Sequence, residues 1–385
     1  MTLPNSKWPK YDNDLIFKVS NLIKKGNVNY LFGKTGLNFE KAFSKYHGLN
    51  YSVAVSNGTV GLELALLSLN LKKKNEIIVS PRSYYSSASC ILRNGLEPVF
   101  ADIDINTHNI SPEEIRKKIS TKTKCIICVH LGGVPCDMEE IMKIARKYNL
   151  KVIEDCSQAH GAKIGKKIVG SFGDISVWSF CNDKIISTLG EGGMISTNNK
   201  KIFERLWSLK DIGKNYQKYN QPSNKFGFQW LHDYVGTNAR LTEVQSLSGL
   251  YQLKKLNSYV VQRRKNANYI KRQLKDIPCF KFIEIPKNFY NSYYRFNFIF
   301  DPIYNSKKIS RDIILKKLNN KIFIRQGSCP EIYKEKFFKK NYKFNCFNAN
   351  YIGKNSLSLQ VDHTIKKKDL VKTIQILKNF TIENL

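Results

Sequence analysis

The sequence has little that would place the chain in a membrane or stabilise it with disulfides. No apolar run approaches the roughly 20 residues of a membrane-spanning helix, and the opening residues, MTLPNSKWPKYDND, lack the apolar core of a signal peptide. The nine cysteines are an odd number and stand singly in apolar segments, a usage typical of a reducing compartment. Hydrophobic residues make up 42% of the chain, enough to exclude general disorder. We therefore expect a cytoplasmic, globular protein with no membrane partner.

Acidic residues are also scarce, with 31 Asp+Glu against 63 Lys+Arg, which gives a formal net charge of +32. Such a charge invites a polyanion as partner. Only 12 of the basic residues are arginine, however, and the 51 lysines are spread along the whole chain. Nucleic-acid readers and phosphate clamps favour arginine because its fork binds bidentately. A compositional drift towards lysine and asparagine explains the charge better, so we expect no specific nucleic-acid partner.

Between about residues 50 and 200, apolar strands alternate with helical patterns. The strands, such as NEIIVS, KCIICVH and KVIEDC, are continuously apolar, as parallel strands buried on both faces should be. This order predicts an α/β fold with a doubly wound, mostly parallel central sheet and a ligand at the carboxyl ends of its strands. From about residue 255 the pattern changes to that of a small α+β domain. We expect residues 1–250 to form the large domain and residues 251–385 the small C-terminal one.

Two motifs carry polar groups at the ends of predicted strands. In KVIEDCSQAHGA an apolar strand ends in Glu154 and Asp155. An ion pair or a helix cap would explain a buried carboxylate there, and so would a protonated ring nitrogen of a cofactor. Further along, Lys184 lies between two apolar strands, just before the Gly-rich turn GEGG. A lysine in such a semi-buried site is expected to have a depressed pKa and to form a Schiff base with an aldehyde.

The SNGT segment leads directly into an apolar helix. Gly58 and Thr59 would offer free amides and a hydroxyl to a phosphate, although an ordinary N-cap is the commoner use of such a segment. In PRSYYSSAS, Tyr85 is placed to stack on a flat ring, although aromatic residues in such helices more often belong to the core. Together these features predict pyridoxal phosphate, with its aldehyde at Lys184 and its ring nitrogen at Asp155. The protonated ring would act as electron sink, and Lys184 would move the proton as general base and acid.

At this point the sequence resembles the DegT-type (DegT/DnrJ/StrS) nucleotide-sugar aminotransferases, which are fold type I pyridoxal phosphate enzymes. The resemblance covers nearly the whole chain, and the matching segments are SNGTVGLELAL, VHLGGVPCDM, VIEDCSQAHGA, WSFCNDKIISTLGEGGM and GTNARLTEVQ. It implies an aspartate-aminotransferase-like large domain. It also implies transfer of an amino group from an amino acid, glutamate in most relatives, to a nucleotide-linked keto sugar. Such products serve amino-sugar and surface-polysaccharide biosynthesis, including lipopolysaccharide O-antigen.

The resemblance also implies roles for individual residues. Lys184 would form the covalent link to the cofactor, Asp155 would bind its ring nitrogen and Gln158 would lie near its ring hydroxyl. Asn238, in the dimer element GTNAR, would reach the cofactor phosphate from the second subunit, so that activity would need a homodimer. The phosphate and the ring face would otherwise be held by Gly58, Thr59, Ser179 and Tyr85.

Two departures from the family pattern concern the substrate. Many members carry His where this chain has Cys181, and many carry a His-Tyr-Pro segment where this chain has IRQGSCPEIYKE. We interpret Arg325 and the GSCPEIY segment as a different lining for the sugar end of the pocket, so the acceptor sugar is expected to differ from the commonest ones. Structural roles are expected for His130 and His160.

Three alternatives are weaker. A pyridoxal phosphate-dependent sugar dehydratase would carry histidine in place of Lys184. A non-catalytic regulatory relative would need a winged-helix segment, for which the roughly 50 residues before SNGT, with LIFKVSNLIKKGN as one helix, leave too little room. A metal enzyme is not expected, because Cys125 and Cys128 form a lone C-x2-C on a strand and face opposite sides of it. The sequence leaves the sugar, the nucleotide and a tetramer made from dimers open.

Overall fold

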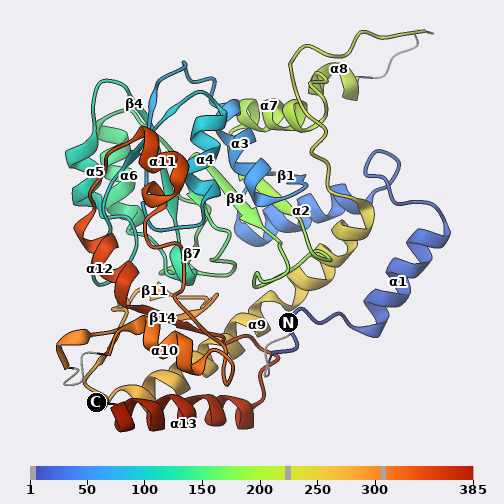
Figure 1. The fold of residues 1–385 in the computed structure, drawn as a ribbon. Coiled ribbons are helices and arrows are strands. Elements are labelled where there is room, and N and C mark those ends of the chain that lie inside the picture. Colours follow the sequence, from blue (N-terminus) through green and yellow to red (C-terminus); the bar gives the residue numbers. More distant parts are fainter. Residues whose placement is uncertain (1–5, 222–226, 305–308, 385) are drawn as a thin grey trace.

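The computed structural model describes residues 6–221, 227–304 and 309–384 (Figure 1). At its centre lies a seven-stranded sheet, in which β9 is antiparallel to both of its neighbours while the strands from β8 to β3 run parallel. In spatial order the strands are β1 (Tyr51–Val55), β9 (Gly193–Thr197), β8 (Ile175–Ser179), β5 (Lys151–Asp155), β4 (Thr123–Val129), β2 (Glu76–Val79) and β3 (Glu97–Phe100). The expected mostly parallel sheet is therefore confirmed.

Helices cover both faces of this sheet, which is why its strands are apolar throughout. One face is covered by α3 (Gly58–Ser68), α4 (Ser86–Arg93) and α7 (Lys200–Lys210). The other face is covered by α2 (Thr35–His47), α5 (Pro112–Lys118), α6 (Met138–Lys147) and α9 (Glu243–Leu274). Cys125 and Cys128, three residues apart on β4, belong to the cores on opposite faces, as the strand period predicts.

A second, antiparallel sheet forms the core of the C-terminal region. Its strands, in spatial order, are β10 (Phe280–Phe282), β12 (Phe296–Phe300), β14 (Ser356–Leu359) and β13 (Ile324–Arg325). It packs against the end of α9 together with α10 (Arg311–Leu318) and α13 (Lys367–Asn384). The helix α9 starts with a capping box of Thr242 and Gln245 and runs without a break from one core to the other (Figure 1). Residue 250, where we expected a domain boundary, lies inside this helix, and the division into two domains stays a prediction.

Part of the C-terminal region returns to the large sheet. Ile332, Phe338 and Ile352 join the same core as α3 and α4, so this part of the C-terminal region packs against the large sheet's helices. In the described ranges, no helix combines the length and the apolarity that crossing a bilayer requires.

The remaining elements are α1 (Asn13–Lys24), β6 (Lys163–Ile164), β7 (Lys167–Ile168), α8 (Tyr216–Asn220), β11 (Phe289–Tyr290), α11 (Lys336–Asn341), α12 (Phe347–Asn355) and the 3-10 turns Leu131–Gly133, Pro302–Tyr304 and Ile332–Lys334.

Candidate active site

A cavity of about 780 Å³ lies at the carboxyl ends of the parallel strands, with the small sheet as its opposite wall. This is the position that a doubly wound sheet predicts for a ligand. Ser328 and Cys329, from the GSCPEIY segment, line the small-sheet side together with Arg325, where we expected a distinct lining. Six of the eight predicted site residues line the cavity: Gly58, Thr59, Asp155, Gln158, Ser179 and Lys184.

Asp155 and Glu154 end the same strand but have different partners. Asp155 lines the cavity, where Oδ2 accepts a hydrogen bond of 3.0 Å from the Ser87 hydroxyl and Oδ1 one of 3.1 Å from the Ser157 amide. Both donors are neutral, so these contacts leave the negative charge of Asp155 without a cation. A buried carboxylate of this kind favours a positively charged partner in the cavity.

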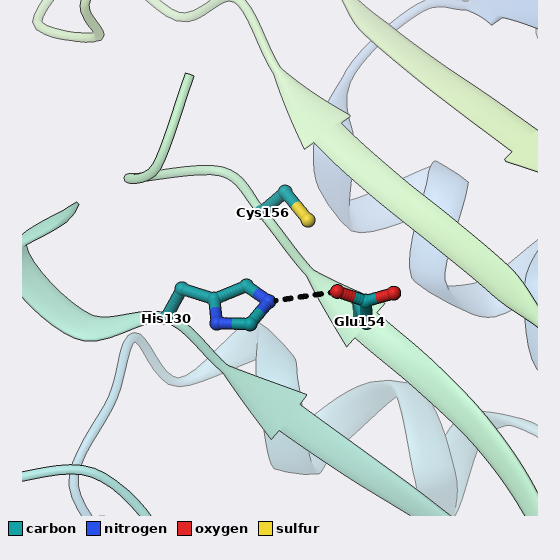
Figure 2. A group of neighbouring side chains, drawn as sticks. All are labelled: His130, Glu154 and Cys156. Atoms are coloured by element: carbon teal, nitrogen blue, oxygen red, sulfur yellow. Dashed lines mark hydrogen bonds and ion pairs between the residues drawn. The ribbon is translucent and has the colours of Figure 1, made fainter. Parts of the chain in front are cut away.

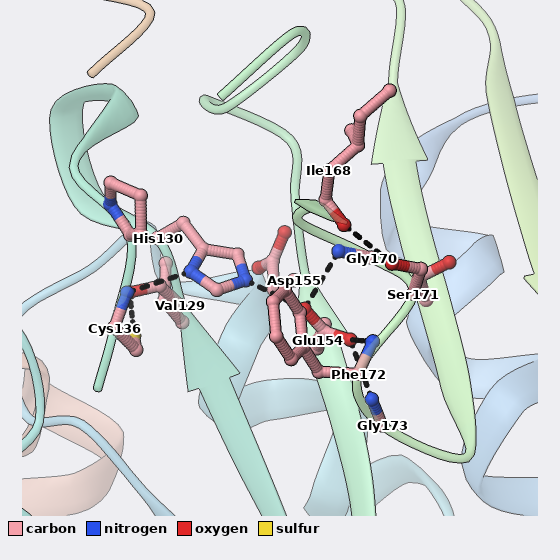
Figure 3. Close-up of polar contacts among 12 residues, drawn as sticks. Val129, His130, Cys136, Glu154, Asp155, Ile168, Gly170, Ser171, Phe172 and Gly173 are labelled. Atoms are coloured by element: carbon pink, nitrogen blue, oxygen red, sulfur yellow. Dashed lines mark hydrogen bonds and ion pairs between the residues drawn. The ribbon is translucent and has the colours of Figure 1, made fainter. Parts of the chain in front are cut away.

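Glu154 is tied instead to the protein interior (Figures 2 and 3). Its carboxylate accepts hydrogen bonds of 2.6–2.7 Å from the amides of Gly170, Phe172 and Gly173, and one of 3.1 Å from Nε2 of His130. Burial alone would raise the pKa of Glu154, but these donors outweigh it and lower the pKa. The cluster joins the ends of β4 and β5 to the loop before β8, and so fixes the strand end that carries the cavity carboxylate.

The same cluster brings possible metal ligands together, since donor atoms of His130, Glu154 and Cys156 lie within 4.8 Å of one another (Figure 2). His130 and Glu154 already use these atoms in hydrogen bonds. The other ring nitrogen of His130, Nδ1, accepts a hydrogen bond of 2.9 Å from the Cys136 amide (Figure 3), and burial raises the pKa of the Cys156 thiol well above its usual value. A metal would have to displace several hydrogen bonds and a proton, so the geometry favours a structural role.

The amino end of α3 forms another part of the cavity wall. Asn57 caps the helix, its side chain accepting a hydrogen bond of 2.9 Å from the Val60 amide, while the amides of Gly58 and Thr59 lie in the first turn, where the helix supplies no acceptor. A β-carbon at residue 58 would lie 2.8 Å from that of Ser179, so only glycine lets the helix end approach β8 so closely. These groups are arranged as a site for an anion such as a phosphate.

Lys184 lies between the two walls. Its Nζ is 3.4 Å from Oδ1 of Asp183 and 4.9 Å from the centre of the Tyr294 ring, and its backbone oxygen accepts a hydrogen bond of 2.8 Å from the Trp8 indole. Burial opposes the charge on the amine, but Tyr294 and Asp183 outweigh it and raise the pKa of Lys184 above its usual value. The expected depressed pKa is therefore wrong for this arrangement of side chains, because an adjacent acid stabilises the ammonium form.

Gln158 lines the cavity next to the carboxylate. Its Oε1 accepts a hydrogen bond of 2.8 Å from the Gly132 amide, which orients the side-chain NH₂ group as a donor for a ligand. Asn238 does not line the cavity of its own chain. It is exposed, and its backbone pairs with Asp211. The role expected for Asn238 concerns a second subunit and stays a prediction.

For the ring-stacking position, Tyr84 lines the cavity and Tyr85 does not, so the stacking role expected for Tyr85 stays a prediction, with Tyr84 as a second candidate. Tyr85 immediately precedes α4, and its ring meets the Phe338 ring edge-on at 5.7 Å.

The small-sheet wall was largely missed by the sequence analysis, which singled out Arg325 and its segment alone. Tyr294, Arg295, Asn297 and Phe323 also line the cavity. A signal was present in YYRFNFIF, where Arg295 and Asn297 alternate with two phenylalanines, as on a strand with one polar and one apolar face. The pattern predicts a polar face on this strand but does not show that this face lines a cavity.

Comparison with known proteins identifies the class. The profile of the DegT/DnrJ/EryC1/StrS aminotransferase family matches residues 9–378, and the chain belongs to this family. The match confirms the resemblance, the fold class and the pyridoxal phosphate-dependent aminotransferase class that the sequence predicted. An X-ray structure of the aminotransferase from Psychrobacter cryohalolentis has 35% sequence identity and a TM-score of 0.96, covering 99% of this chain and 100% of that one.

Two curated relatives carry more specific names. GDP-perosamine synthase of Escherichia coli O157:H7 is 40% identical over 239 residues, which are 62% of this chain and 63% of that enzyme. The dTDP-3-amino-3,6-dideoxy-alpha-D-galactopyranose transaminase of Aneurinibacillus thermoaerophilus is 38% identical over 257 residues, 67% of this chain and 66% of that enzyme. The chain thus matches just under two thirds of the length of each of these relatives.

Proposed function

We propose that this protein transfers an amino group from an amino acid, glutamate, to the keto group of a nucleotide-linked deoxy sugar, with pyridoxal phosphate as cofactor. The names of the two curated relatives, each a nucleotide-linked amino sugar enzyme, support the substrate class. The observation that carries the proposal is one cavity lined by both Lys184 and the buried Asp155, whose hydrogen bonds within the described residues come from neutral donors. Lys184 also disfavours a sugar dehydratase of the branch that has histidine at this position.

The residues present fit the cofactor. Asp155 offers its charge to a protonated ring nitrogen, and Gln158 offers a donor for the ring hydroxyl. Tyr84 is placed to cover the ring face. Gly58 and Thr59 offer the unpaired amides of α3 to the phosphate. When bound, pyridoxal phosphate would take up the electron pair that is left when a proton leaves the carbon next to the reacting nitrogen.

The remaining chemistry belongs to the chain's own side chains. Lys184 would hold the cofactor aldehyde until a substrate amine replaces it, and its freed Nζ would then remove the proton from one carbon and return it to another. Asp183 and Tyr294 hold this amine at the boundary between the two walls. The side chain of Lys184 is only 16% exposed, so bulk water has little access to the transferred proton.

We further propose a cytoplasmic homodimer in amino-sugar or surface-polysaccharide biosynthesis. Large apolar side chains are exposed on α1 and near residue 230, for example Phe17 at 64%, Trp230 at 78% and Val235 at 94%. Exposed apolar groups of this size favour burial against a partner. Asn238 lies in the same region of the sequence and would enter the second subunit's site. The nine cysteines are all free thiols, which suits a reducing compartment.

The test is the visible absorption spectrum of the protein reconstituted with pyridoxal phosphate, recorded before and after addition of glutamate. A yellow band that bleaches with glutamate and is missing in Lys184→Ala would establish the amino-donor half of the reaction. Turnover by Lys184→Ala with any amino donor would contradict the mechanism. A screen of keto sugars linked to GDP, dTDP or UDP would then identify the acceptor.

A further inference from the structure

Two arginines flank one aromatic ring on the small-sheet wall of the cavity. The guanidinium carbons of Arg295 and Arg325 lie 4.9 and 5.1 Å from the centre of the Phe323 ring, so they are at most 10 Å apart. Both side chains are partly buried and line the cavity. A guanidinium over the face of an aromatic ring is attracted by it, so the Phe323 ring stabilises both charges.

Arg325 also belongs to a polar row that crosses the small sheet. It pairs with Ser358 on β14, which in turn pairs with Asn297 on β12, and all three residues line the cavity. Oδ1 of Asn297 is buried and, among the described residues, has no hydrogen-bond partner. Both hydrogen bonds that Arg325 makes in the described part of the chain, to the Asn319 side chain and to the Ile324 carbonyl, use Nη1. Its Nε and Nη2 donors therefore remain for a ligand.

A third cation lies behind this row. Arg82 is 1% exposed, and its Nη2 is 3.6 Å from the position of a β-carbon at Gly327, a cavity-lining residue. Nη2 donates a hydrogen bond of 3.0 Å to Ser356, whereas Nε and Nη1 have no partner within the described ranges. A buried guanidinium that is not matched by a carboxylate makes this end of the cavity attractive to anions.

Arg295 is close to the reacting amine. Its Nη2 is 3.6 Å from Oδ2 of Asp183, and the other oxygen of the same carboxylate is 3.4 Å from Nζ of Lys184. One carboxylate group therefore separates the guanidinium from the lysine. An α-amino acid carries its carboxylate on the carbon that bears the reacting nitrogen, so a cation at this distance from Lys184 is placed to receive it.

We propose that Arg295 and Arg325 form a subsite for a dicarboxylate amino donor, in which Arg295 binds the α-carboxylate and Arg325 binds the side-chain carboxylate. The inference rests on the proposed transamination and names the residues that select its donor. Guanidinium groups suit this task because their planar fork matches a carboxylate bidentately. The donor leaves as a keto acid before the sugar enters, so both substrates can use the same volume in turn.

The alternative ligand for two arginines is the diphosphate of the sugar nucleotide. The diphosphate is attached to the anomeric carbon of the sugar, whereas the keto group, which must reach Lys184, is on another carbon of the ring. Arg295, in contrast, is separated from Lys184 by the Asp183 carboxylate alone. A carboxylate on the sugar itself would have the same chemistry as that of the donor. The experiment therefore has to separate these three sources of negative charge.

The test compares Arg325→Gln and Arg295→Gln holoenzymes, with Arg272→Gln as control, since Arg272 is an exposed arginine on α9 outside the cavity. Binding of glutarate, a dicarboxylate without an amine, is measured by calorimetry, and the half-reaction is followed with glutamate and with norvaline, which lacks the distal carboxylate. We expect Arg325→Gln to lower kcat/KM for glutamate about 10- to 100-fold and that for norvaline less than about 3-fold. Arg295→Gln should lower both, and each variant should weaken glutarate binding.

Several outcomes would overturn the subsite. One is weaker binding of GDP, dTDP or UDP with unchanged glutarate binding, which would assign the arginines to the diphosphate. Another is weaker binding of D-glucuronate alone, which would assign them to a sugar carboxylate. Arg325→Lys guards against misfolding, because it keeps the charge and should recover part of the glutarate affinity. If the wild type binds glutarate through Arg325 but glutamate never bleaches the cofactor band, the subsite stands and the proposed transamination fails.

Discussion

The hydroxyl group of Ser87, in the first turn of α4, donates a hydrogen bond of 3.0 Å to Oδ2 of Asp155 at the end of β5. A second hydroxyl, that of Ser83, lies 2.9 Å from Ser87 and continues the chain of hydrogen bonds. The carboxylate proposed to hold the cofactor ring is therefore oriented from the helix side by neutral donors, which fix its direction without neutralising it.

Ser87→Ala should weaken cofactor binding with little effect on folding. A hydrogen bond to a charged group contributes about 1.5–3 kcal/mol, so we expect the Kd of pyridoxal phosphate to rise about 10-fold or more. Ser89→Ala, a change of the same size on the same helix outside the cavity lining, is the control. Titration of the apoprotein by absorbance measures both. Equal affinities in the two variants would show that the Ser87 hydroxyl has no such role.

Two glycines of α3 allow the phosphate site to be tested separately from helix packing. A β-carbon at Gly58 would lie 2.8 Å from the Ser179 β-carbon, and one at Gly61 would lie 2.8 Å from Cγ1 of Val177, outside the cavity lining. Alanine at either position should overpack the core and destabilise the fold by about 1–3 kcal/mol. Only Gly58→Ala should also raise the Kd of pyridoxal phosphate. Thermal unfolding measures the stability of both variants, and cofactor titration measures their affinity. Equal loss of affinity in the two variants would refute a phosphate-binding role for Gly58.

The adjacent tyrosines give a matched pair for the ring face. Tyr84→Ala removes an aromatic ring from the cavity wall, whereas Tyr85→Ala removes the edge contact with Phe338. An aromatic pair contributes about 0.5–1.5 kcal/mol beyond its buried area, so Tyr84→Ala should weaken cofactor binding about 3- to 10-fold. Tyr85→Ala should lower the melting temperature and leave cofactor affinity unchanged. The opposite pattern would support the stacking role that the sequence predicts for Tyr85.

Some of these site residues could be predicted from the sequence and others could not. Asp155, Ser179 and the Gly58–Thr59 pair were predictable because each follows or precedes an apolar strand, and consecutive parallel strands bring their carboxyl ends to one edge. That Tyr84 rather than Tyr85 lines the cavity was not predictable, because it depends on the residue at which α4 begins.

The small-sheet wall could not be predicted from local patterns. Arg295 directly precedes β12 and Arg325 lies on β13, and they meet on Phe323 only because β14, which comes later in the sequence, pairs between these two strands. Likewise, the raised pKa of Lys184 depends on Tyr294, which lies 110 residues away in the sequence. The sequence prediction took account of burial, which lowers the pKa, but neither of the neighbouring Asp183 nor of Tyr294, which only the tertiary fold brings to the amine.

The raised pKa of Lys184 predicts how the apoprotein takes up its cofactor. A protonated amine cannot attack an aldehyde, so capture of pyridoxal phosphate should accelerate as pH rises above 7. Asp183→Asn removes one of the groups that raise this pKa and should speed capture at pH 7.5. Capture is measured by mass spectrometry after borohydride reduction. Asp233→Asn, at an exposed pair with Lys218, should leave the rate unchanged.

Stability in mild acid should depend on His47, which is 2% exposed and packed between Phe43 and Trp178. Its Nδ1–H donates a hydrogen bond of 2.9 Å to the Phe43 carbonyl, and burial lowers the pKa of the ring from 6.5 to about 4. Between these pH values the unfolded chain binds a proton that the folded protein excludes, so the free energy of unfolding falls as pH drops from 6.5 to 4. The shift corresponds to about 3 kcal/mol.

Replacing the ring by a group that does not titrate should remove this part of the pH dependence. We expect His47→Gln, which keeps a donor for the Phe43 carbonyl, to be less stable than the wild type at pH 7 because the ring packing is lost. Its stability should then fall less steeply between pH 6.5 and 4. His232→Gln, at an exposed histidine, should follow the wild-type curve. Urea unfolding at half-unit intervals of pH gives the free energy of unfolding of all three proteins. Parallel curves for wild type and His47→Gln would mean that other groups cause the loss of stability in acid.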